Sequence, residues 1–387
     1  MARLGRVLVE ALVHEYGRDE ILRRLANPFW FQSLGCVMGM DWHSSGITTS
    51  VLGALRRGLA PVEGELGLHV CGGRGRHSRR TPGELTALGE RIGFDGAALS
   101  RASRLVAKVD GALLQDGHQL YLHGFVVTDE GRWCVVQQGM NPESRTARRY
   151  HWLSEGLQSF VDEPHAAIEG APLGEIVNLA DRRAAPSREA QLSLVREPAR
   201  LFAELARAPR LTMPSRHEVT AADVVGRRIE GALRAAAERG PADFPELLLT
   251  PGVGARTVLA LALVAELVHG APCRFSDPAR FSLAHGGKDG HPFPVPLSVY
   301  DRTIRTMRGA VDQAKLGGDD KLAAIRRLDL EARRLEAASR GVDVEALLKK
   351  ERADSWRFGG RHVGGAVEPP TVAVKARRPA PRQLSLF

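Results

Sequence analysis

Residues 119–138 read QLYLHGFVVTDEGRWCVVQQ, and this stretch decides the fold class. Aromatic and β-branched side chains fill Gln119–Thr128 and Arg132–Gln138, two runs of strand length. The tripeptide Asp-Glu-Gly at 129–131 separates them and is typical of a hairpin turn. The stretch therefore predicts two neighbouring antiparallel strands. Helix-patterned segments flank them, so we expect an α+β domain.

Outward from this hairpin, the composition and hydrophobic pattern of the chain change three times. Residues 1–170 mix helical patterns with glycine-rich turns and form a predicted α+β catalytic domain. Residues 171–215 are rich in Ala, Arg and Pro and predict a connecting segment, and residues 216–355 have a helical pattern. Residues 356–387 are rich in Gly, Pro and Arg, which predicts a flexible basic tail because such a composition cannot bury a core.

The composition limits the partners and the compartment. With 54 Lys+Arg against 45 Asp+Glu, the net charge of +9 favours an anionic partner, most commonly nucleic acid. The four cysteines are widely spaced, which excludes a disulfide framework and the usual structural zinc sites. Without a run of 18 apolar residues, we expect no membrane partner and a cytoplasmic, nucleoid-associated protein.

The clearest local motif is LLTPGVGART at residues 248–257, followed by the apolar run VLALALVAELVHG. A short helix is predicted to end at Pro251 and a second to begin at about Ala255. Glycines permit close approach by a partner, and the free N–H groups that begin a helix suit a phosphate oxygen. The segment resembles the helix-hairpin-helix element of DNA glycosylases, ligases and nucleases. This resemblance implies DNA contacts from Gly252, Val253, Gly254, Arg256 and Thr257.

The last five residues resemble the peptide that binds the bacterial sliding clamp. They are Gln383, Leu384, Ser385, Leu386 and Phe387. The apolar side chains suit a pocket, and the tail before them would act as a tether. A near-match, QLSLV, occurs at 191–195 in an amphipathic stretch, where we expect a helix and a core role instead.

Polar clusters on glycine-rich turns suggest an active site in the first domain. Carboxylate and imidazole side chains are the groups that phosphodiester hydrolysis with Mg²⁺ or Mn²⁺ needs. The predicted catalytic residues are Asp110, Asp116, His118, Gln138 and His151. The predicted metal ligands are Asp41, His43, Asp110 and Asp116.

Two basic segments of this domain are expected to contact phosphates. The glycine-rich loop at 72–80 carries Arg74, Arg76 and Arg79, and a second basic segment lies at 145–149. The sequence GxxxxGK[ST] is absent, so hydrolysis of nucleoside triphosphates is not expected.

Four longer segments resemble one known family. They read PFWFQSLGCVMGMDWHSSG, LQDGHQLYLHGFVVTDEGRWCVVQQGMNPESRTARRYHW, SFVDEPHAAI and AHGGKDGHPFPV. Together they are similar to the uncharacterised prokaryotic domain-of-unknown-function family numbered 763, over residues from about 5 to about 315. The resemblance implies no established chemistry.

The patterns lead to one main hypothesis and two alternatives. We expect a DNA-repair or DNA-processing protein, a metal-dependent nuclease that the sliding clamp recruits. One alternative is a monofunctional glycosylase that uses a carboxylate such as Asp277 and no metal. The other is a non-enzymatic adaptor that binds both DNA and the clamp. The sequence leaves the oligomeric state open.

Overall fold

The computed structural model describes residues 1–40, 46–197, 199–201, 203, 227–279, 305–312, 321, 323–327, 353, 361–362 and 365–366. The chain divides into two compact units, Met1–Val342 and Asp343–Phe387. In the second unit, β8 (Arg361–His362) pairs antiparallel with β9 (Gly365–Ala366). All elements discussed below belong to the first unit.

An antiparallel sheet forms the centre of this unit. Its order is β1-β3-β4-β5-β6, with bounds Leu68–Arg74, Gln119–Thr128, Trp133–Met140, Ala147–Leu153 and Ala167–Glu169. The hairpin predicted between residues 119 and 138 is confirmed as β3 and β4, with the turn closed by the N–H of Thr128 on the carbonyl of Arg132 at 2.9 Å. A second small sheet pairs β2 (Leu114–Gln115) with β7 (Val177–Asn178). The fold class is α+β, as expected.

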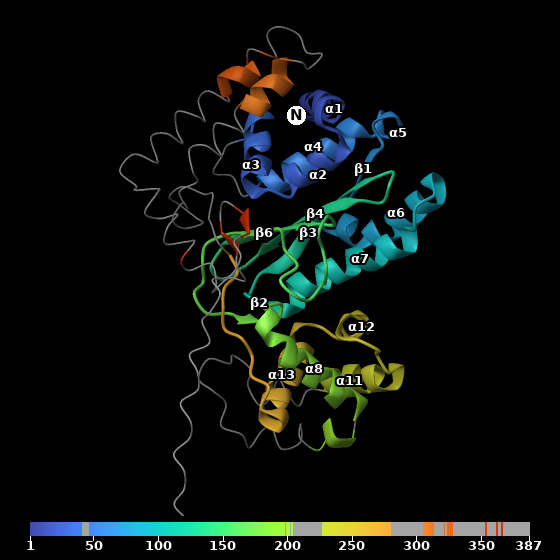
Figure 1. Ribbon diagram of the computed structural model, residues 1–387, viewed down its shortest axis with the longest axis vertical. Coiled ribbons are helices and arrows are strands. Elements are labelled where there is room, and N and C mark those ends of the chain that lie inside the picture. The colour runs from blue at the N-terminus through green and yellow to red at the C-terminus, as the bar shows by residue number, and fades with distance from the viewer. Residues whose placement is uncertain are drawn as a thin grey trace, which may run out of the picture. The chain divides into compact units, whose positions relative to one another are not determined.

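Both faces of the large sheet are covered by hydrophobic clusters. Side chains alternate between the two faces along each strand, so neighbouring residues of a strand belong to different clusters. Phe125, Val135 and Trp152 belong to one hydrophobic cluster, whereas Val126 and Val136 belong to the other. Figure 1 shows the N-terminal helices on one side of the sheet and α6 and α7 on the other. Polar residues on neighbouring positions of a strand therefore face different layers.

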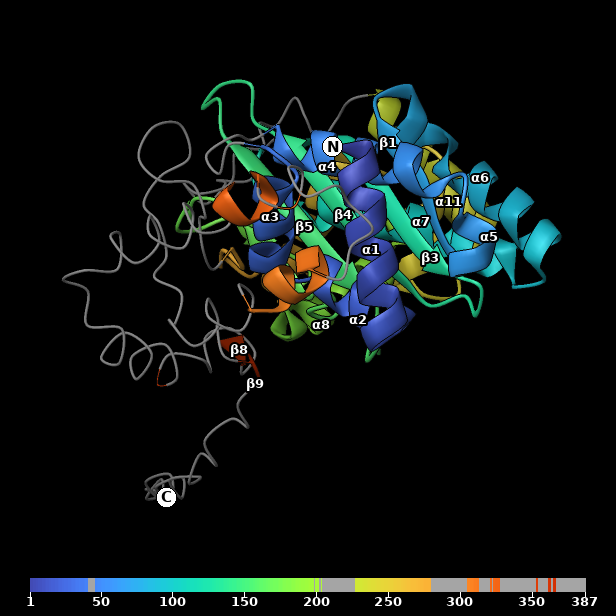
Figure 2. The same cartoon turned by 90° about the horizontal axis from the view of Figure 1, so that it is seen from above.

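The N-terminal layer is built from four helices and a short fifth. These are α1 (Ala2–Tyr16), α2 (Arg18–Leu25), α3 (Pro28–Val37), α4 (Ile47–Leu59) and α5 (Glu63–Leu66). Asn27 caps α3, since its side chain accepts from the N–H groups of Phe29 and Trp30. Every residue of α3 is buried. Figure 2 looks onto this layer and shows α1 and α3 across the strands.

The chain returns to this layer after a long excursion. Residues 305–312 and 323–327 are helical, and Met307, Val311 and Ala324 are buried in the same cluster as α1, α3 and α4. The guanidinium of Arg327 also donates to the carbonyl of Val37 at 3.1 Å. Residues that follow the 227–279 segment therefore pack against helices from the start of the chain.

The opposite face carries an antiparallel pair of helices, α6 (Arg76–Ile92) and α7 (Gly96–Lys108). A Cβ on Gly89 would lie only 2.6 Å from the Cα of Gly96, so these two glycines allow a close crossing. Asp95 caps α7 by accepting from the N–H of Ala98 at 2.8 Å. The chain then continues into the π-helical turn η1 (Val109–Leu113).

Further helices extend from this face. They are η2 (Arg182–Ala184), α8 (Ala185–Arg196), α11 (Arg227–Arg239), α12 (Phe244–Leu249) and α13 (Ala255–His269). Leu194, Leu248 and Leu261 share one hydrophobic cluster with Phe125 and Trp152 of the sheet. None of the helices in the described part of the chain has the length and apolar character needed to cross a membrane.

Candidate functional site

Asp110 lies in η1 and is completely buried. Its Oδ1 accepts from Nε2 of His165 at 2.5 Å, and its Oδ2 accepts from Nε1 of Trp152 at 3.1 Å and from Nε2 of Gln137. A buried carboxylate needs such donors, because burying an unpaired charge is costly. The lone pairs of Asp110 are thus used by donors from three other parts of the chain.

Gln137 extends this network across the face of the sheet. Because its Nε2 donates to Asp110, its Oε1 accepts from Nδ1 of His123 at 2.5 Å. Nε2 of His123 then accepts from the hydroxyl of Ser103, 2.9 Å away. Burial lowers the pKa of His123, which keeps its ring neutral. Ser103 is 2% exposed, so this serine–histidine pair is closed to substrate.

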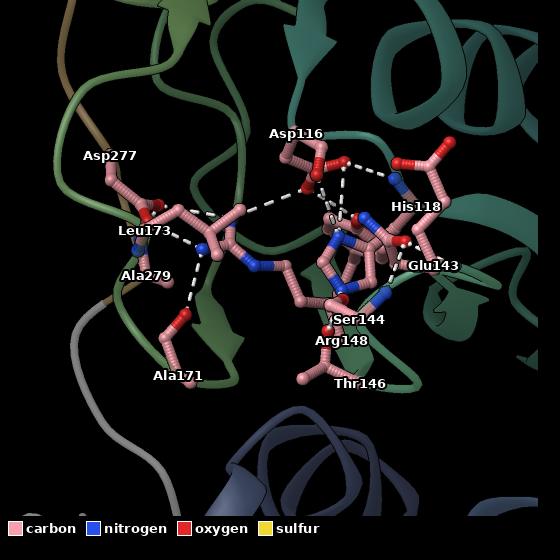
Figure 3. Close-up of polar contacts among 12 residues, drawn as sticks. Asp116, His118, Glu143, Ser144, Thr146, Arg148, Ala171, Leu173, Asp277 and Ala279 are labelled. Atoms are coloured by element: carbon pink, nitrogen blue, oxygen red, sulfur yellow. Dashed lines mark hydrogen bonds and ion pairs between the residues drawn. The ribbon is translucent and has the colours of Figure 1, made fainter. Parts of the chain in front are cut away.

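A second buried network joins Asp116, Arg148 and Asp277 (Figure 3). Oδ2 of Asp116 accepts from the hydroxyl of Tyr150 at 2.6 Å and from Nη1 of Arg148 at 3.3 Å. Nη1 of Arg148 also reaches Oδ1 of Asp277 at 3.0 Å, and its Nη2 donates to Oδ2 of Asp277 and to the carbonyl of Ala171. One guanidinium therefore links two carboxylates inside the protein.

The surroundings of Asp116 and Tyr150 shift the pKa of each group away from its usual value. Burial raises the pKa of Asp116, but the hydrogen bond from His118, the charge of Arg148 and the Tyr150 hydroxyl outweigh it, so the pKa lies below its usual value. Burial and the neighbouring Asp116 charge raise the pKa of Tyr150 well above 10.0, so the phenol stays a neutral donor. These described contacts make the network an ion pair with a neutral phenol attached.

Asp277 reaches Arg148 because the segment after α13 runs beside β7. The N–H of Asn178 donates to the carbonyl of Arg274 at 2.8 Å, and the N–H of Ser276 donates to that of Ile176 at 3.0 Å. Both oxygens of Asp277 are engaged, with N–H groups of Leu173 at 2.6 Å and Ala279 at 2.9 Å in addition to Arg148. Asp277, the carboxylate named for the glycosylase alternative, therefore accepts hydrogen bonds from three different residues.

The five predicted catalytic residues do not come together. Asp110, Asp116 and His118 lie on the side of the sheet that carries α7, whereas Gln138 and His151 alternate to the other side. Nδ1 of His151 donates to the carbonyl of Leu25 in α2 at 3.0 Å. The side chains of this set are separated by the sheet itself.

The donor sets around Asp110 and Asp116 do not fit Mg²⁺ or Mn²⁺. These ions need several oxygen ligands that converge on one point. The carboxylate oxygens here face N–H and O–H donors instead, and no group of three or more His, Cys, Asp or Glu side chains among the described residues could hold a metal. Asp41 and His43, the other predicted ligands, lie outside the described residues.

The structure corrects the expectation that the basic segment 145–149 contacts DNA throughout. Arg149 is 3% exposed, pairs with Glu169 at 3.3 Å, donates to Gln32 at 3.0 Å and lies over the Phe31 ring. Arg148 is equally buried. Both belong to β5, an interior strand whose two faces are covered, so only Arg145 of this segment is exposed.

The helices of the 244–269 segment agree in part with the expectation, because α13 begins at Ala255 as predicted whereas α12 ends at Leu249, before Pro251. Gly252 has a φ of 85°, which glycine adopts without strain, and the N–H of Val253 closes the turn on the carbonyl of Thr250 at 3.1 Å. The side chain of Val253 is buried, whereas Gly252 and Arg256 are exposed. Thr257 is buried as well, and its hydroxyl donates to the carbonyl of Gly252 at 3.5 Å. Thr257 therefore braces the turn from inside.

A second exposed feature is the arginine patch, defined as Arg74, Arg76, Arg79 and Arg80. The expected loop at 72–80 is mostly regular structure, because β1 runs to Arg74 and α6 begins at Arg76. All four patch residues are exposed, and none forms an ion pair with any residue that the structure describes. The positive charge of the patch is available to an anionic partner.

Sequence reasoning names Asp277 and the segment that contains Arg148, but it misses the pairing of these two residues and it misses Lys108. Arg148 and Asp277 are 129 positions apart, and Lys108, which contacts the turn at Val253, is 145 positions from it. No local pattern marks such pairs, because they depend on how distant elements pack. The alternation of side chains on β5 is the one signal that separates buried from exposed positions there.

One comparison with known proteins is informative. Residues 1–295 match the family model described as "Protein of unknown function (DUF763)". Neither the curated proteins nor the solved structures include a significant match to the chain. Because the family model covers well over half of the 387 residues, this chain belongs to the DUF763 family.

Proposed function

We propose that the protein binds the backbone of duplex DNA through the turn between α12 and α13 together with the arginine patch, and that its last five residues bind a sliding clamp. The turn is the observation that carries the proposal. It exposes Gly252 and Arg256 at the start of a 15-residue helix, whose first N–H groups have no partner within the helix. Such groups, with the positive end of the helix dipole, favour a phosphate oxygen.

The arginine patch supports the same partner. It begins α6, and the antiparallel arrangement places that first turn at the same end of the pair as the last turn of α7. Lys108, in that last turn, contacts the carbonyl of Val253. The patch and the α12–α13 turn therefore lie at one end of the α6–α7 pair. Backbone N–H groups of the turn and arginine side chains of the patch would both contact phosphates and not base edges, so binding is expected to be largely independent of sequence.

The buried networks favour a binding role over catalysis. Asp110, Asp116 and Asp277 use their oxygens on internal donors, which leaves none of them to activate water or stabilise a cation. We therefore propose an adaptor for DNA repair or processing. A nuclease of this family would need ligands outside the described residues, where Asp41 and His43 lie.

Fluorescence anisotropy with a random-sequence duplex tests the DNA part. Wild-type protein is expected to bind with an affinity that falls steeply with salt, and Arg256→Ala should weaken binding at every sequence equally. Arg23→Ala is the matched control, because Arg23 is an exposed arginine of α2, on the other side of the sheet. Equal affinity of wild type and Arg256→Ala would contradict the role of the turn.

Incubation with single-stranded, duplex, flap and damaged DNA tests the adaptor role. We expect binding without cleavage in Mg²⁺ or Mn²⁺, and no release of damaged bases in EDTA. Metal-dependent cleavage would instead favour the nuclease, and base release that survives EDTA would favour the glycosylase. Either activity would overturn the adaptor proposal while leaving DNA binding in place.

The clamp part rests on the sequence pattern, because Gln383–Phe387 lies outside the described residues. Deleting these five residues should abolish capture of the protein by immobilised sliding clamp. The near-match at 191–195 is an internal control: it forms part of α8, with Gln191, Leu194 and Val195 buried. Clamp binding that persists in the deletion variant would contradict the proposal.

A further inference from the structure

Two side chains from outside the α12–α13 turn hold its backbone. The ammonium of Lys108, at the end of α7, donates to the carbonyl of Val253. Nε2 of Gln115, in β2, donates to the carbonyl of Ala255 at 3.2 Å and to that of Ala112 at 2.6 Å. The turn is therefore fastened to the sheet-bearing body at two adjacent points.

The positive charge of Lys108 is not neutralised by a carboxylate among the described residues. Lys108 is half-buried and forms no ion pair with a carboxylate in the described part of the chain. Desolvation lowers its pKa, which is the direction expected for a partly buried ammonium without a counter-ion. Its bond to Val253 is charge-assisted, and such bonds are stronger than neutral ones.

Peptide geometry links this contact to the outer side of the turn. The carbonyl of Val253 and the N–H of Gly254 belong to one planar trans peptide, so they point in opposite directions. Holding the carbonyl toward Lys108 turns the N–H of Gly254 away from α7. No described residue accepts a hydrogen bond from that N–H, and Gly254 carries no side chain to cover it.

We propose that Lys108 is a positioning residue for phosphate binding: by holding the Val253 carbonyl, it aims the N–H of Gly254 and the start of α13 at a phosphodiester oxygen. The inference rests on the proposed DNA-binding function and names the device that prepares the turn for it. Since α7 also packs on α6, the same contact sets the turn in register with the arginine patch, so that one duplex meets both. Gln115 supports this arrangement from the other side.

Lys108→Met, Lys108→Arg and Gln115→Ala test the device, with Arg101→Met as the control on the exposed side of α7. Hydrogen exchange of the Val253 amide is the first readout, since that N–H closes the turn on Thr250. Lys108→Met should accelerate this exchange about tenfold, the effect of losing one bond to a charged group. Lys108→Arg should restore much of the protection, Gln115→Ala should have a smaller effect, and Arg101→Met should have none.

Duplex affinity against salt is the second readout. A positioning residue should weaken binding by about tenfold when replaced by Met, yet leave the salt slope unchanged, because it neutralises no phosphate itself. A slope reduced by about 0.9 would mean that Lys108 contacts a phosphate directly, which would overturn the proposal.

The two proposals fail in different ways. If wild-type protein does not bind the duplex, the DNA function fails, while the exchange of Val253 still tests whether Lys108 holds the turn. The duplex could be bound through Arg256 while Lys108→Met changes neither the hydrogen exchange of the Val253 amide nor the duplex affinity. In that case only the positioning role is wrong. If Lys108→Met does not fold, Lys108→Gln serves in its place, because it also removes the ammonium that holds the Val253 carbonyl.

Discussion

Arg148 links two carboxylates in the interior of the first unit. It is 1% exposed and lies between the carboxylates of Asp116 and Asp277. A buried ion pair adds little net stability relative to apolar residues of the same size, but removing one partner leaves a buried charge without compensation. Its value is therefore in holding the 271–279 segment to β5 in one arrangement.

Arg148→Met should lower the free energy of unfolding by about 3–5 kcal/mol, because Asp116 and Asp277 would then repel one another inside the protein. The measurement is urea unfolding followed by circular dichroism. Arg76→Met serves as the control, because Arg76 is exposed and forms no ion pair with the residues that the structure describes, and it should change stability by less than about 0.5 kcal/mol. Similar stability losses in both variants would contradict a special role for Arg148.

The low pKa of Asp116 predicts how acid affects stability. A carboxyl group whose pKa is lower in the folded state than unfolded stabilises the protein above the unfolded value, here 3.8. That stability is lost as the pH falls from 3.8 through the folded-state pKa. The difference in urea midpoint between wild type and Asp116→Asn should therefore shrink over this acidic range and stay constant from about pH 5 to 7. A difference that grows on acidification would contradict the assignment.

For single residues, the sequence indicates which polar side chains are unusual, but it does not show which contacts they make. Asp110 and Asp116 stand out as polar residues in a hydrophobic context, and both are buried. The donors that contact them, such as His165 and Arg148, come from later segments of the chain, so the sequence could not show that their oxygens already accept hydrogen bonds.

At the scale of elements, the α12–α13 turn was predictable because its signals are local. Pro251 follows the end of α12 at Leu249, and Gly252 supplies a positive φ, so the position of the turn follows from a few adjacent residues. The start of α6 was not predictable in the same way. Gly72 and Gly73 suggest a loop, but Gly72 pairs with Gly124 of β3 and the helix begins as soon as the strand ends.

The two glycines of the turn should respond differently to alanine. Gly252→Ala places a Cβ at a φ of 85° and 3.2 Å from the Cβ of Ala232, so it should cost about 1–2 kcal/mol of stability. Gly254 has an extended φ of −145° with open space around it. Gly254→Ala should leave stability within about 0.5 kcal/mol of wild type, as measured by urea unfolding.

DNA binding separates the two variants further. Because the methyl group of Gly254→Ala would stand where a phosphate approaches, this variant should lose affinity for the duplex in anisotropy titrations despite its normal stability. Retained affinity in Gly254→Ala would show that no phosphate comes close to this backbone.

At the scale of the whole molecule, we expect the net charge of +9 to promote DNA binding mainly through the arginine patch. Replacing Arg74, Arg76 and Arg79 together by Ala should reduce the slope of log affinity against log salt by about 0.9 for each phosphate that these arginines neutralise. A triple replacement of three ion-paired arginines elsewhere, Arg18, Arg23 and Arg132, provides an equal change in charge. If both triple variants lower the slope equally, overall charge rather than the patch governs binding.

The return of the chain to the N-terminal layer gives the α12–α13 turn an unusual mechanical setting. The 227–279 segment packs in the buried cluster that contains α8 and one face of the sheet, whereas Met307 packs in the cluster of the N-terminal layer, so the chain is anchored both within this segment and after it. A pull exerted by bound DNA would be shared by two attachments instead of one hinge. A protein cut once between residues 279 and 305 should consequently remain a single particle, held together by Met307, Val311 and Ala324 in their apolar seat.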